Sequence, residues 1–537
     1  MTQNNPRVLP QNSGRFGPGA VFTLAVAIAL AFAIFTDQRW EDYYITFRVS
    51  QNLAKGAGLV FQPGERVHVF TSPLGVLLPA FISWMTGTQS DELTLWIFRL
   101  VTIAAFGGAA ATVWSIARAL GWSRMSCAFA AGLLMTDAKS VSFSGNGMET
   151  AFMLLFLALA IRQLIADPGG GGWRLGCCWA ALMWTRPDSF IFFGGVALGW
   201  LLFAPGSKAF GRRRVIARLY IRAGIVCAAL YLPWFIWAWW YYGSPVPHTV
   251  VAKGIGLHLP GLGGLLYAFV TLPIRAFGSG KWDFLLTPIY AVDFGGWPHF
   301  IVYVARALVV IALWAIVLPR VERSTRALSI GFAIASFYLV VVQVFPWYNP
   351  PAAMLAFLVL AGVLEAGVRV IRLRFFLTTV SLSVFLFAGS LLLGSAWQLR
   401  QQQRIIEGQR KEIGEWLKAH QTSPTDAVFL EPLGYIGYYS QLKMFDYPGL
   451  SSPEVVDARL KYGENGIILV NALEPRWVVA RPGEMGSNNA GLNNWFTDHY
   501  ALAKVFDARN QIADVKFLPG RPYLQFDQVF LIWERKL

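Results

Sequence analysis

The chain has 537 residues, of which 55% are hydrophobic and only 14% are charged, and it contains 22 Trp and 40 Phe. A soluble protein of this length does not need so many apolar side chains, so the composition indicates a polytopic α-helical membrane protein. Lys and Arg outnumber Asp and Glu by 45 to 30. In a soluble chain that excess would suggest nucleic acid as a partner, whereas here we interpret it as a signal of membrane topology and expect no nucleic acid.

Eleven apolar runs are candidates for membrane spans, each of which needs about 20 residues, although several of these runs are short. They lie at roughly 20–36, 93–117, 125–140, 148–165, 174–185, 189–204, 219–241, 299–318, 328–345, 351–368 and 375–397. The first run is interpreted as an uncleaved span, because no small-residue cleavage motif follows it. A further apolar run at 73–88 has no basic boundary before it, and we assign it to a juxtamembrane helix at the outer surface.

Basic residues orient these spans, because short cytoplasmic loops retain Lys and Arg. With eleven spans and a cytoplasmic N-terminus, every inner loop is basic. The residues are Arg118, Arg124, Arg162, Arg174, Lys208, Arg212, Arg213, Arg214, Arg218, Arg320, Arg323, Arg326, Arg369, Arg372 and Arg374. Counting 73–88 as a span would place the first of these loops outside and invert the later ones. The chosen topology also brings the polar motifs described below to the outer side.

From residue 398 onward the composition becomes polar. A charged helical stretch at 398–420 precedes short β-rich runs, AVFL (427–430), GIILV (466–470), RWVVA (476–480) and QVFLIWE (528–534). About 140 residues can bury a modest core of their own, so we expect a small α/β domain, on the outer side because the number of spans is odd. The predicted domains are a transmembrane domain over 1–397, with a first outer loop at 37–92, and a soluble domain over 398–537.

The one polar, motif-dense segment after the first apolar run is 41–79. It begins with two adjacent carboxylates, Glu41 and Asp42, continues with Tyr44 and Arg48 at helical spacing, and then breaks at glycines and prolines. This pattern predicts a helix followed by a tight loop. An acidic pair at the end of a membrane helix is also a common solvated feature with no chemical role, and composition alone does not separate the two interpretations.

The segment resembles the first extracytoplasmic loop of the GT-C glycosyltransferases that use polyprenyl-phosphate donors. The similarity is to the arabinofuranosyltransferase branch, whose members act on mycobacterial cell wall or pseudomonad pilin. The family pattern is an acidic residue and Asp, an aromatic, I-(S/T)-(F/L)-R, then G-x-G-L-V-(F/W) to P-G-E-R-V and (F/Y)-T-(S/N)-P-L. The matching segments here are 41–42, 44–48, 56–67 and 70–74, with further matches at GNGMET (145–150), TRPDS (185–189), GSPVPHTVVAK (243–253) and 434–454.

This resemblance implies transfer of a sugar from a lipid phosphate to a hydroxyl. Such chemistry needs a carboxylate to take the acceptor proton or stabilise an oxocarbenium-like centre, and cations to hold the departing phosphate. Asp42 aligns with the family's acidic position and Glu41 is the second candidate, with the division of labour between them open. The candidate ligands of the donor phosphate or sugar that the resemblance implies are Arg48, Lys139, Arg186, His248 and Lys253. The substrate-lining residues that it implies are Tyr44, Glu149, Asp188, Tyr348 and Asp446.

Each of these positions also has a structural interpretation. A Lys in an outer loop is usually only solvated, Glu149 at the start of a span is favoured by the helix dipole, and Arg186 can simply pair with Asp188. Asp446 lies in a sequence typical of a turn. The carboxylates lack the spacing of a protein-built metal cage, so a divalent cation (Mg²⁺ or Mn²⁺) held through the donor phosphate is left open.

The resulting hypothesis is a multi-pass glycosyltransferase of the bacterial inner membrane with a periplasmic C-terminal domain. It transfers D-arabinofuranose from a polyprenyl-phosphate carrier in the lipid bilayer to an extracytoplasmic glycan or a protein such as pilin. A GT-C enzyme that transfers mannose or aminoarabinose to protein or lipid A is the alternative within the fold. A flippase or transporter of lipid-linked sugars is the alternative from another class, and it would typically show buried charges within its spans and repeated halves.

Overall fold

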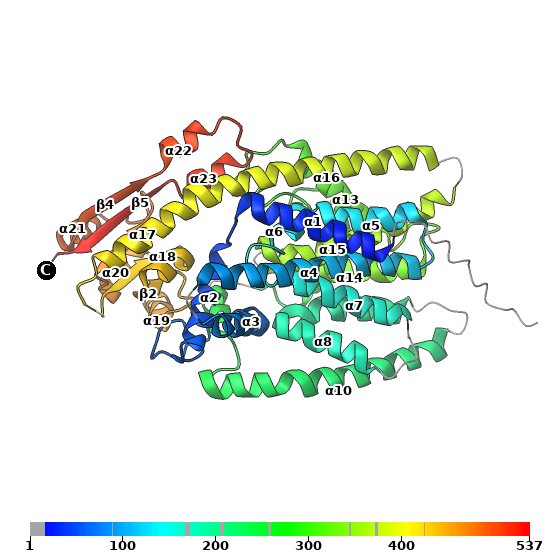
Figure 1. The fold of residues 1–537 in the computed structure, drawn as a ribbon, viewed down its shortest axis with the longest axis horizontal. Coiled ribbons are helices and arrows are strands. Elements are labelled where there is room, and N and C mark those ends of the chain that lie inside the picture. The colour runs from blue at the N-terminus through cyan, green and yellow to red at the C-terminus, as the bar shows by residue number, and fades with distance from the viewer. Residues whose placement is uncertain are drawn as a thin grey trace, which may run out of the picture.

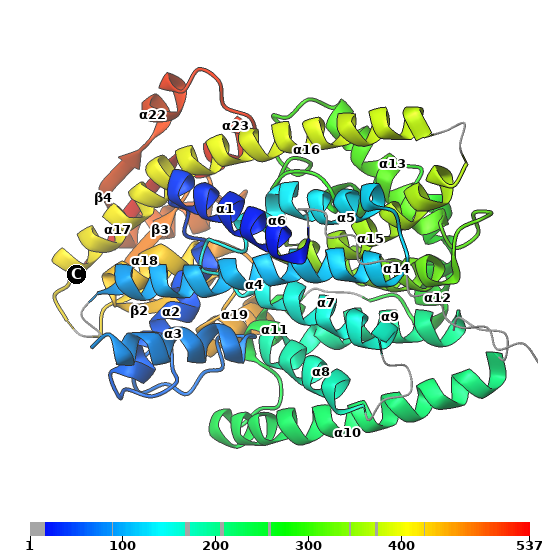
Figure 2. The same cartoon turned by 45° about the vertical axis from the view of Figure 1, so that its right-hand side comes forward.

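The computed structural model describes residues 17–87, 90–166, 172–203, 209–255, 259–342, 345–370, 374–423 and 425–536, without the side chains of 209–212. Lys208, Arg372 and the Arg212 side chain, which contributed to the predicted topology, lie outside these residues. Long helices run side by side through one part of the molecule, and a smaller α/β domain covers one end of this bundle (Figures 1 and 2).

All eleven predicted spans contain a helix. The helices are α1 (Pro18–Thr36), α4 (Asp91–Ala119), α5 (Arg124–Thr136), α7 (Thr150–Ala166), α8 (Trp173–Thr185), α9 (Phe190–Leu202), α10 (Ala209–Tyr242), α13 (Phe300–Trp314), α14 (Arg323–Val341), α15 (Asn349–Val368) and α16 (Arg374–Gln402). Among the described residues, six helical stretches are long and apolar enough to cross a bilayer, and they include α1, α4, α10, α14, α15 and α16. The other five helices are shorter, so the chain is a multi-pass membrane protein for which a count of eleven spans stays a prediction.

Shorter helices lie between the long ones along the chain. They are α2 (Glu41–Ala54), α3 (Pro73–Met85), α6 (Ala138–Ser142), η1 (Pro187–Ser189), α11 (His248–Gly254), α12 (Leu262–Arg275), η2 (Lys281–Phe284) and η3 (Pro346–Tyr348). Helix α3 begins where the Ser72 hydroxyl accepts a hydrogen bond from the Gly75 N–H at 2.9 Å. It is seen nearly end-on in Figure 1 and therefore lies across the direction of the bundle, as expected of a juxtamembrane helix.

The basic loops gather at the end of the bundle away from the α/β domain. The C-terminal end of α4 and the N-terminal ends of α8, α10 and α16 all lie at this end in Figure 1. The basic residues that flank these helix ends therefore share one side of the molecule. This arrangement agrees with the topology derived from the positions of Lys and Arg.

Helix α16 does not stop at the predicted domain boundary. It continues through a π-helical turn, Gln403–Glu407, into α17 (Gly408–Ala419), so that residue 398 lies within one helical stretch. The five-stranded sheet that follows has the order β2-β1-β3-β5-β4, in which β1 is parallel to β2 and β3, and β5 is antiparallel to β3 and β4. The strands are β1 (Ala427–Leu430), β2 (Lys443–Asp446), β3 (Trp477–Ala480), β4 (Tyr500–Asp507) and β5 (Val529–Arg535). The helices between them are α18 (Leu433–Ser440), α19 (Pro453–Tyr462), α20 (Gly466–Leu473), α21 (Ala490–His499), α22 (Arg509–Asp514) and α23 (Arg521–Phe526).

One strand prediction is wrong, because the GIILV run forms helix α20. The Asn465 side chain accepts hydrogen bonds from the N–H groups of Ile467 and Ile468, at 3.0 and 3.2 Å, and so caps the start of a helix. A five-residue apolar run is too short for its periodicity to separate a strand from a buried helix. The less hydrophobic strands β2 and β4 were not among the predicted runs.

The α/β domain shares a hydrophobic core with the first outer loop. Buried side chains of that loop, including Ile45, Val49 and Phe61, belong to the same cluster as Val428 and Ile436 of the domain. Helices α2 and α18 also lie in contact. The expected domain core is therefore only part of what stabilises the domain, because much of its sheet packs on residues from the other end of the sequence.

Arg48 connects α2 to the same domain. Its fully buried guanidinium donates hydrogen bonds to the carbonyl oxygens of Gly437 at 2.8 Å and Leu442 at 3.2 Å, and to the Gln62 side chain at 3.1 Å. Hydrogen bonds from a charged donor stabilise by more than neutral ones, and a buried acceptor that loses its donor is costly. Arg48 therefore fixes the position of α2 beneath the domain.

We expect Arg48→Ala to lower the free energy of unfolding by about 3 kcal/mol, because two buried carbonyl oxygens and the partly buried Gln62 side chain lose their donor. Thermal unfolding of the purified protein, together with limited proteolysis of the α/β domain, measures this effect. Lys55→Ala is the matched control, since Lys55 is an exposed basic residue at the end of the same helix. Equal stability of the two variants would contradict the docking role of Arg48.

Candidate functional site

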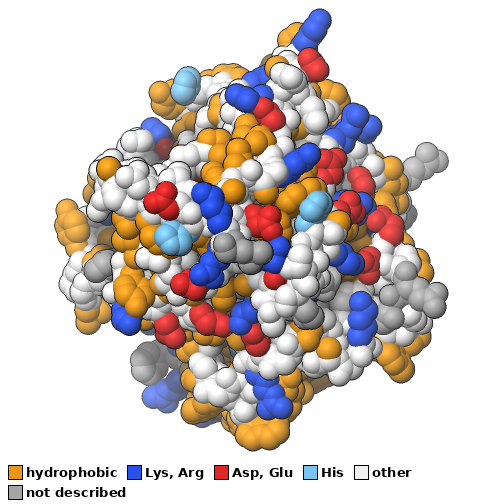
Figure 3. Space-filling model, turned by 90° about the vertical axis from the view of Figure 1, so that its left-hand side faces the viewer, with side chains coloured by type: hydrophobic (Ala, Val, Ile, Leu, Met, Phe, Trp, Pro, Cys, Tyr) orange, Lys and Arg blue, Asp and Glu red, His pale blue; other side chains and the backbone are white. Residues whose placement is uncertain are grey.

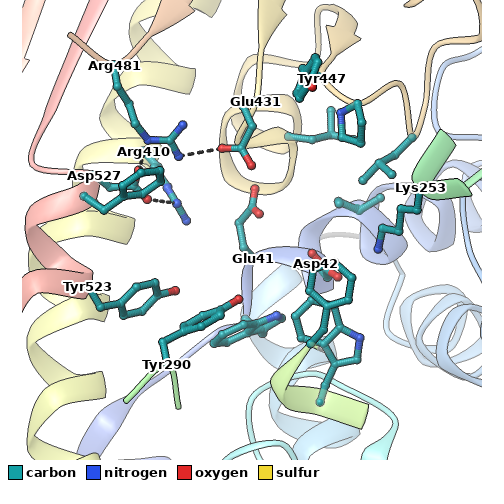
Figure 4. Close-up of a pocket in the computed structure, with 18 of the residues that line it drawn as sticks. Glu41, Asp42, Lys253, Tyr290, Arg410, Glu431, Tyr447, Arg481, Tyr523 and Asp527 are labelled. Atoms are coloured by element: carbon teal, nitrogen blue, oxygen red, sulfur yellow. Dashed lines mark hydrogen bonds and ion pairs between the residues drawn. The ribbon is translucent and has the colours of Figure 1, made fainter. Parts of the chain in front are cut away.

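A cavity of about 480 Å³ lies between α2, α11 and the α/β domain. Figure 4 shows that Glu41, Asp42 and Lys253 point into it from the membrane-proximal side, while Glu431, Arg410, Arg481 and Asp527 face it from the domain. Aromatic side chains make up much of the remaining wall, namely Trp40, Tyr290, Phe294, Phe345, Trp347, Tyr447, Tyr523 and Phe526.

A smaller cavity of about 80 Å³ adjoins the larger one. The two cavities share Asp42, Lys253 and Trp347 in their linings. Among the sequence-predicted residues, the smaller cavity adds Glu149, Arg186 and Tyr348. Asp42 and Lys253 therefore lie where the two cavities meet, and motifs from four separate stretches of the chain converge there.

The two carboxylates sit in the first turn of α2, where the helix dipole favours negative charge. The Glu41 Oε1 atom accepts a hydrogen bond from the Gly434 N–H at 2.5 Å, so this side chain also ties α2 to α18. Burial raises the pKa of Glu41 to about 8, with Arg410 opposing and Asp42 adding to the shift. Burial likewise raises the pKa of Asp42, and the nearby charges of Lys253 and Arg186 oppose that rise.

The cations beside Asp42 rest on aromatic rings. Lys253 lies in the last turn of α11, and its Nζ atom lies 4.6 Å from the centre of the Phe345 ring. The Arg186 guanidinium carbon lies 4.0 Å from the centre of the Tyr348 ring. Burial lowers the pKa of Lys253 and the Asp42 charge opposes this change. The segment at 243–253, in which Lys253 was placed in an outer loop, thus consists of a loop followed by a short helix that carries Lys253.

Arg186 is held by two carboxylates. Its Nη1 atom lies 3.4 Å from Glu149 Oε1 and its Nε atom 3.1 Å from Asp188 Oδ1. The Tyr338 hydroxyl donates to Asp188 Oδ2 at 2.8 Å. Arg186 therefore pairs with Asp188, but it also pairs with Glu149 and lines the smaller cavity. Asp188 itself lies outside both cavity linings, as an orienting partner of Arg186.

Three predicted donor ligands lie outside both cavity linings. Arg48 binds the backbone of the α/β domain, as described above. The Lys139 ammonium donates to the carbonyl oxygen of Phe284. The backbone N–H of His248 donates to the carbonyl oxygen of His68 at 2.9 Å. The structure therefore brings Lys253 and Arg186 to Asp42 but does not bring the other three predicted cations there.

Besides Asp188, two predicted substrate-lining residues are absent from both cavity linings. The Tyr44 hydroxyl lies 3.1 Å from the Tyr439 hydroxyl, within a cluster of tyrosines between α2 and α18. The Asp446 carboxylate accepts hydrogen bonds from the N–H groups of Leu450 and Ser451, at 2.5 and 2.8 Å, and stabilises the turn after β2. The turn interpretation of Asp446 is therefore the one that the geometry favours.

Several lining residues of the α/β domain were missed in the sequence. Glu431 directly follows β1 and Arg481 directly follows β3, and these two strands are parallel neighbours. Polar residues at the carboxyl ends of adjacent parallel strands meet at one edge of a sheet, which is the signal that would have found them. Arg481 Nη2 lies 2.7 Å from Glu431 Oε2 and Arg481 Nε lies 2.5 Å from Asp527 Oδ1.

Among the described residues, no group of three or more His, Cys, Asp or Glu side chains is arranged to hold a metal ion. Asp42 and Glu41 are the cavity carboxylates beside the cations, whereas Glu407 and Asp527 are engaged by Arg410. These side chains do not form a protein-built metal site.

The architecture is that of the GT-C membrane glycosyltransferases. The structure superimposes on crystalline ArnT from Cupriavidus metallidurans bound to undecaprenyl phosphate with a TM-score of 0.57, covering 95% of this chain and 97% of that one at 12% identity. This likeness establishes the fold.

In sequence, the chain is similar to two proteins named terminal β-(1→2)-arabinofuranosyltransferase. The relative from Corynebacterium glutamicum is 27% identical over 281 residues, which cover 45% of this chain and 38% of that protein. The relative from Mycobacterium tuberculosis is 28% identical over 247 residues, covering 43% and 37%. The matches thus span less than two fifths of either relative. A family described as a domain of unknown function (DUF8728) matches residues 397–526.

The raised pKa of Glu41 predicts a pH-dependent stability. At pH values below 4.5, the ordinary pKa of a glutamate side chain, Glu41 is protonated in both the folded and the unfolded chain, and its full contribution to stability is present. This contribution is lost as the pH rises through about 8, because the unfolded chain ionises first. Glu41→Gln should therefore flatten the fall in unfolding temperature between pH 5 and about 8, while the exposed Glu412→Gln should leave the profile of the natural protein unchanged. Identical profiles for all three proteins would refute the shift.

Proposed function

We propose that the chain is a glycosyltransferase that moves a pentofuranose from a polyprenyl phosphate to a hydroxyl group of an extracytoplasmic acceptor. The sugar proposed is D-arabinofuranose. The observation that carries this proposal is the junction of the two cavities, where Asp42 lies among Lys253, Arg186 and aromatic rings. A carboxylate beside fixed cations is what transfer from a sugar phosphate requires.

In the proposed reaction, Lys253 and Arg186 bind the phosphate oxygens of the donor. The bond between the anomeric carbon and the phosphate oxygen breaks, and the phosphate keeps the electron pair. A bond forms between the anomeric carbon and the acceptor oxygen, whose proton passes to Asp42. Because burial raises the pKa of Asp42, its carboxylate is a stronger base than a solvated one. The cations balance the negative charge that develops on the phosphate.

The geometry favours Asp42 over Glu41 as the base. Asp42 lines both cavities and faces Lys253 and Arg186, whereas Glu41 lines only the larger one. Glu41 is bonded to the Gly434 N–H and, with its pKa near 8, is largely protonated at neutral pH. A protonated carboxyl does not accept the acceptor's proton. Glu41 is therefore assigned to positioning α2 and closing the cavity wall.

The choice of sugar rests on sequence similarity alone. Two relatives are named as arabinofuranosyltransferases, and the loop motifs at 41–74 belong to the same branch. A donor that carries mannose or aminoarabinose, with protein or lipid A as acceptor, is the alternative that the same fold allows. Assays with polyprenyl phosphates of these three sugars, using one preparation of the protein, separate the alternatives.

The bilayer supplies the donor. A polyprenyl chain does not leave the membrane, so its phosphosugar must be met near the headgroup level. The cavity lies between α2, α11 and the α/β domain, which covers one end of the bundle. The proposed location is the bacterial inner membrane, with the N-terminus in the cytoplasm and the α/β domain in the periplasm. ArnT bound to undecaprenyl phosphate has this fold and supports a polyprenyl-phosphate donor. A flippase is disfavoured because the charges of the larger cavity lie between α2, α11 and the α/β domain and not along the spans.

Asp42→Asn should lower transfer from decaprenyl-phosphate arabinofuranose by at least about 100-fold, because the acceptor proton loses its base. Binding of the donor lipid and the unfolding temperature should change little, since the amide keeps the shape of the side chain. Asp457→Asn, at an exposed position of the α/β domain, is the control and should retain full transfer. Full activity of Asp42→Asn would remove the catalytic assignment.

Lys253→Met should weaken binding of undecaprenyl phosphate by about tenfold, because one charge-assisted contact to the phosphate is lost while the apolar stem remains. Native mass spectrometry or thermal stabilisation by the lipid measures the affinity. Lys411→Met, at an exposed site on α17, is the matched control. Undiminished affinity in Lys253→Met would place the phosphate elsewhere.

A further inference from the structure

The half of the cavity away from Lys253 opens toward water. Residues of the α/β domain form much of its wall, and two of them, Glu431 and Phe526, have side chains that are about half exposed, at 49% and 51%. Arg481 lies between them, with its guanidinium carbon 4.3 Å from the centre of the Phe526 ring. Glu431 and Phe526 therefore mark a mouth through which a ligand can enter without crossing the bilayer.

The charges in this half are paired. Arg481 contacts Glu431 and Asp527, and Arg410 contacts Asp527 and, at 3.0 Å, Glu407. Figure 3, which shows the face of the molecule at the α/β domain, has acidic and basic side chains interspersed. A network of paired charges does not attract an anion strongly, because each guanidinium already faces a carboxylate. It does offer donors and acceptors side by side.

Aromatic rings complete this half of the cavity. The Tyr523 ring lies 4.5 Å from that of Tyr290 and 5.1 Å from that of Phe294, and Phe294 lies 5.4 Å from Phe526. Apolar ring faces next to fixed polar groups suit a ligand with hydroxyls on its edge and C–H bonds on its face. A hydroxyl can donate to a carboxylate and accept from a guanidinium, so paired charges serve it on both sides.

We propose that this half of the cavity is the acceptor site and that it binds the uncharged, hydroxyl-rich end of a glycan, with Glu431 and Arg481 holding its hydroxyls. The inference rests on the proposed transferase function and selects one acceptor class from those that the function leaves open. Glu431 Oε2 is bonded to Arg481, and Figure 4 shows the Glu431 carboxylate directed across the cavity toward Glu41. A sugar held there presents a hydroxyl toward Asp42, while the donor phosphate occupies the opposite half.

The chain offers a matched pair of variants for the test. Both Glu431 and Glu484 pair with Arg481 at 2.7 Å, but only Glu431 lines the cavity. The probe is a neutral octyl arabinofuranosyl disaccharide, compared with the same disaccharide carrying a phosphate and with a Ser/Thr-containing peptide. Glu431→Gln should raise the KM for the neutral disaccharide about tenfold, as expected for loss of one charge-assisted hydrogen bond. Glu484→Gln should keep that KM within about twofold, and neither variant should change binding of undecaprenyl phosphate.

Several outcomes would overturn the assignment. They are preferential transfer by the natural protein to the peptide or to the phosphorylated disaccharide, an equal response of both variants, and an effect of Glu431→Gln on the donor lipid alone. Saturation-transfer NMR of the neutral disaccharide with the full-length protein gives a readout independent of turnover. If the natural protein gives this signal but shows no transfer, and the Glu431→Gln variant loses the signal, the glycan site is retained and the transferase function is rejected. No signal from the natural protein would reject the glycan site.

Discussion

The position of α2 is the constraint on which the site depends. This helix begins with the two cavity carboxylates, and it is held between the bundle and the α/β domain by contacts along its whole length. Glu41 bonds the Gly434 N–H, Arg48 bonds carbonyl oxygens further along α18, and the tyrosines between them form a buried cluster. A Cβ on Gly434 would lie 2.0 Å from the Glu41 carbonyl oxygen, so the close approach of α18 requires glycine there.

These contacts of α2 explain how the protein holds two carboxylates in the wall of a cavity. Removing a carboxylate from water is costly unless neighbouring charges or hydrogen bonds offset the loss. Asp42 has Lys253 and Arg186 nearby, whereas Glu41 has a backbone N–H and responds to burial by holding its proton. Two adjacent carboxylates in one helical turn thus both have a raised pKa but lie among different neighbours. Their different assignments come from these neighbours, because the residue types themselves are almost equivalent.

The cavity joins two environments that a transferase of lipid-linked sugars must connect. Near Lys253 and Arg186, cations rest on aromatic rings at the level of the bundle. Near Glu431, the wall is a network of paired charges that is open to water. The C-terminal domain and the first outer loop therefore both line the cavity, and their shared hydrophobic core makes them one folded unit.

The sequence by itself determined the membrane class, the helices, the polar C-terminal domain and the resemblance to GT-C enzymes, because these depend on composition and on short contiguous motifs. It also singled out Asp42, Arg186 and Lys253. Only the tertiary structure decided which of these side chains reach Asp42, since Arg48 and Lys139 bind backbone carbonyl oxygens elsewhere and His248 lies outside both cavity linings. It likewise decided that Glu431, which lies nearly 400 residues further along the chain, faces Glu41 across the cavity beside Arg481. The physical reason is that motifs report chemistry along the chain, whereas a cavity is made by packing between distant segments.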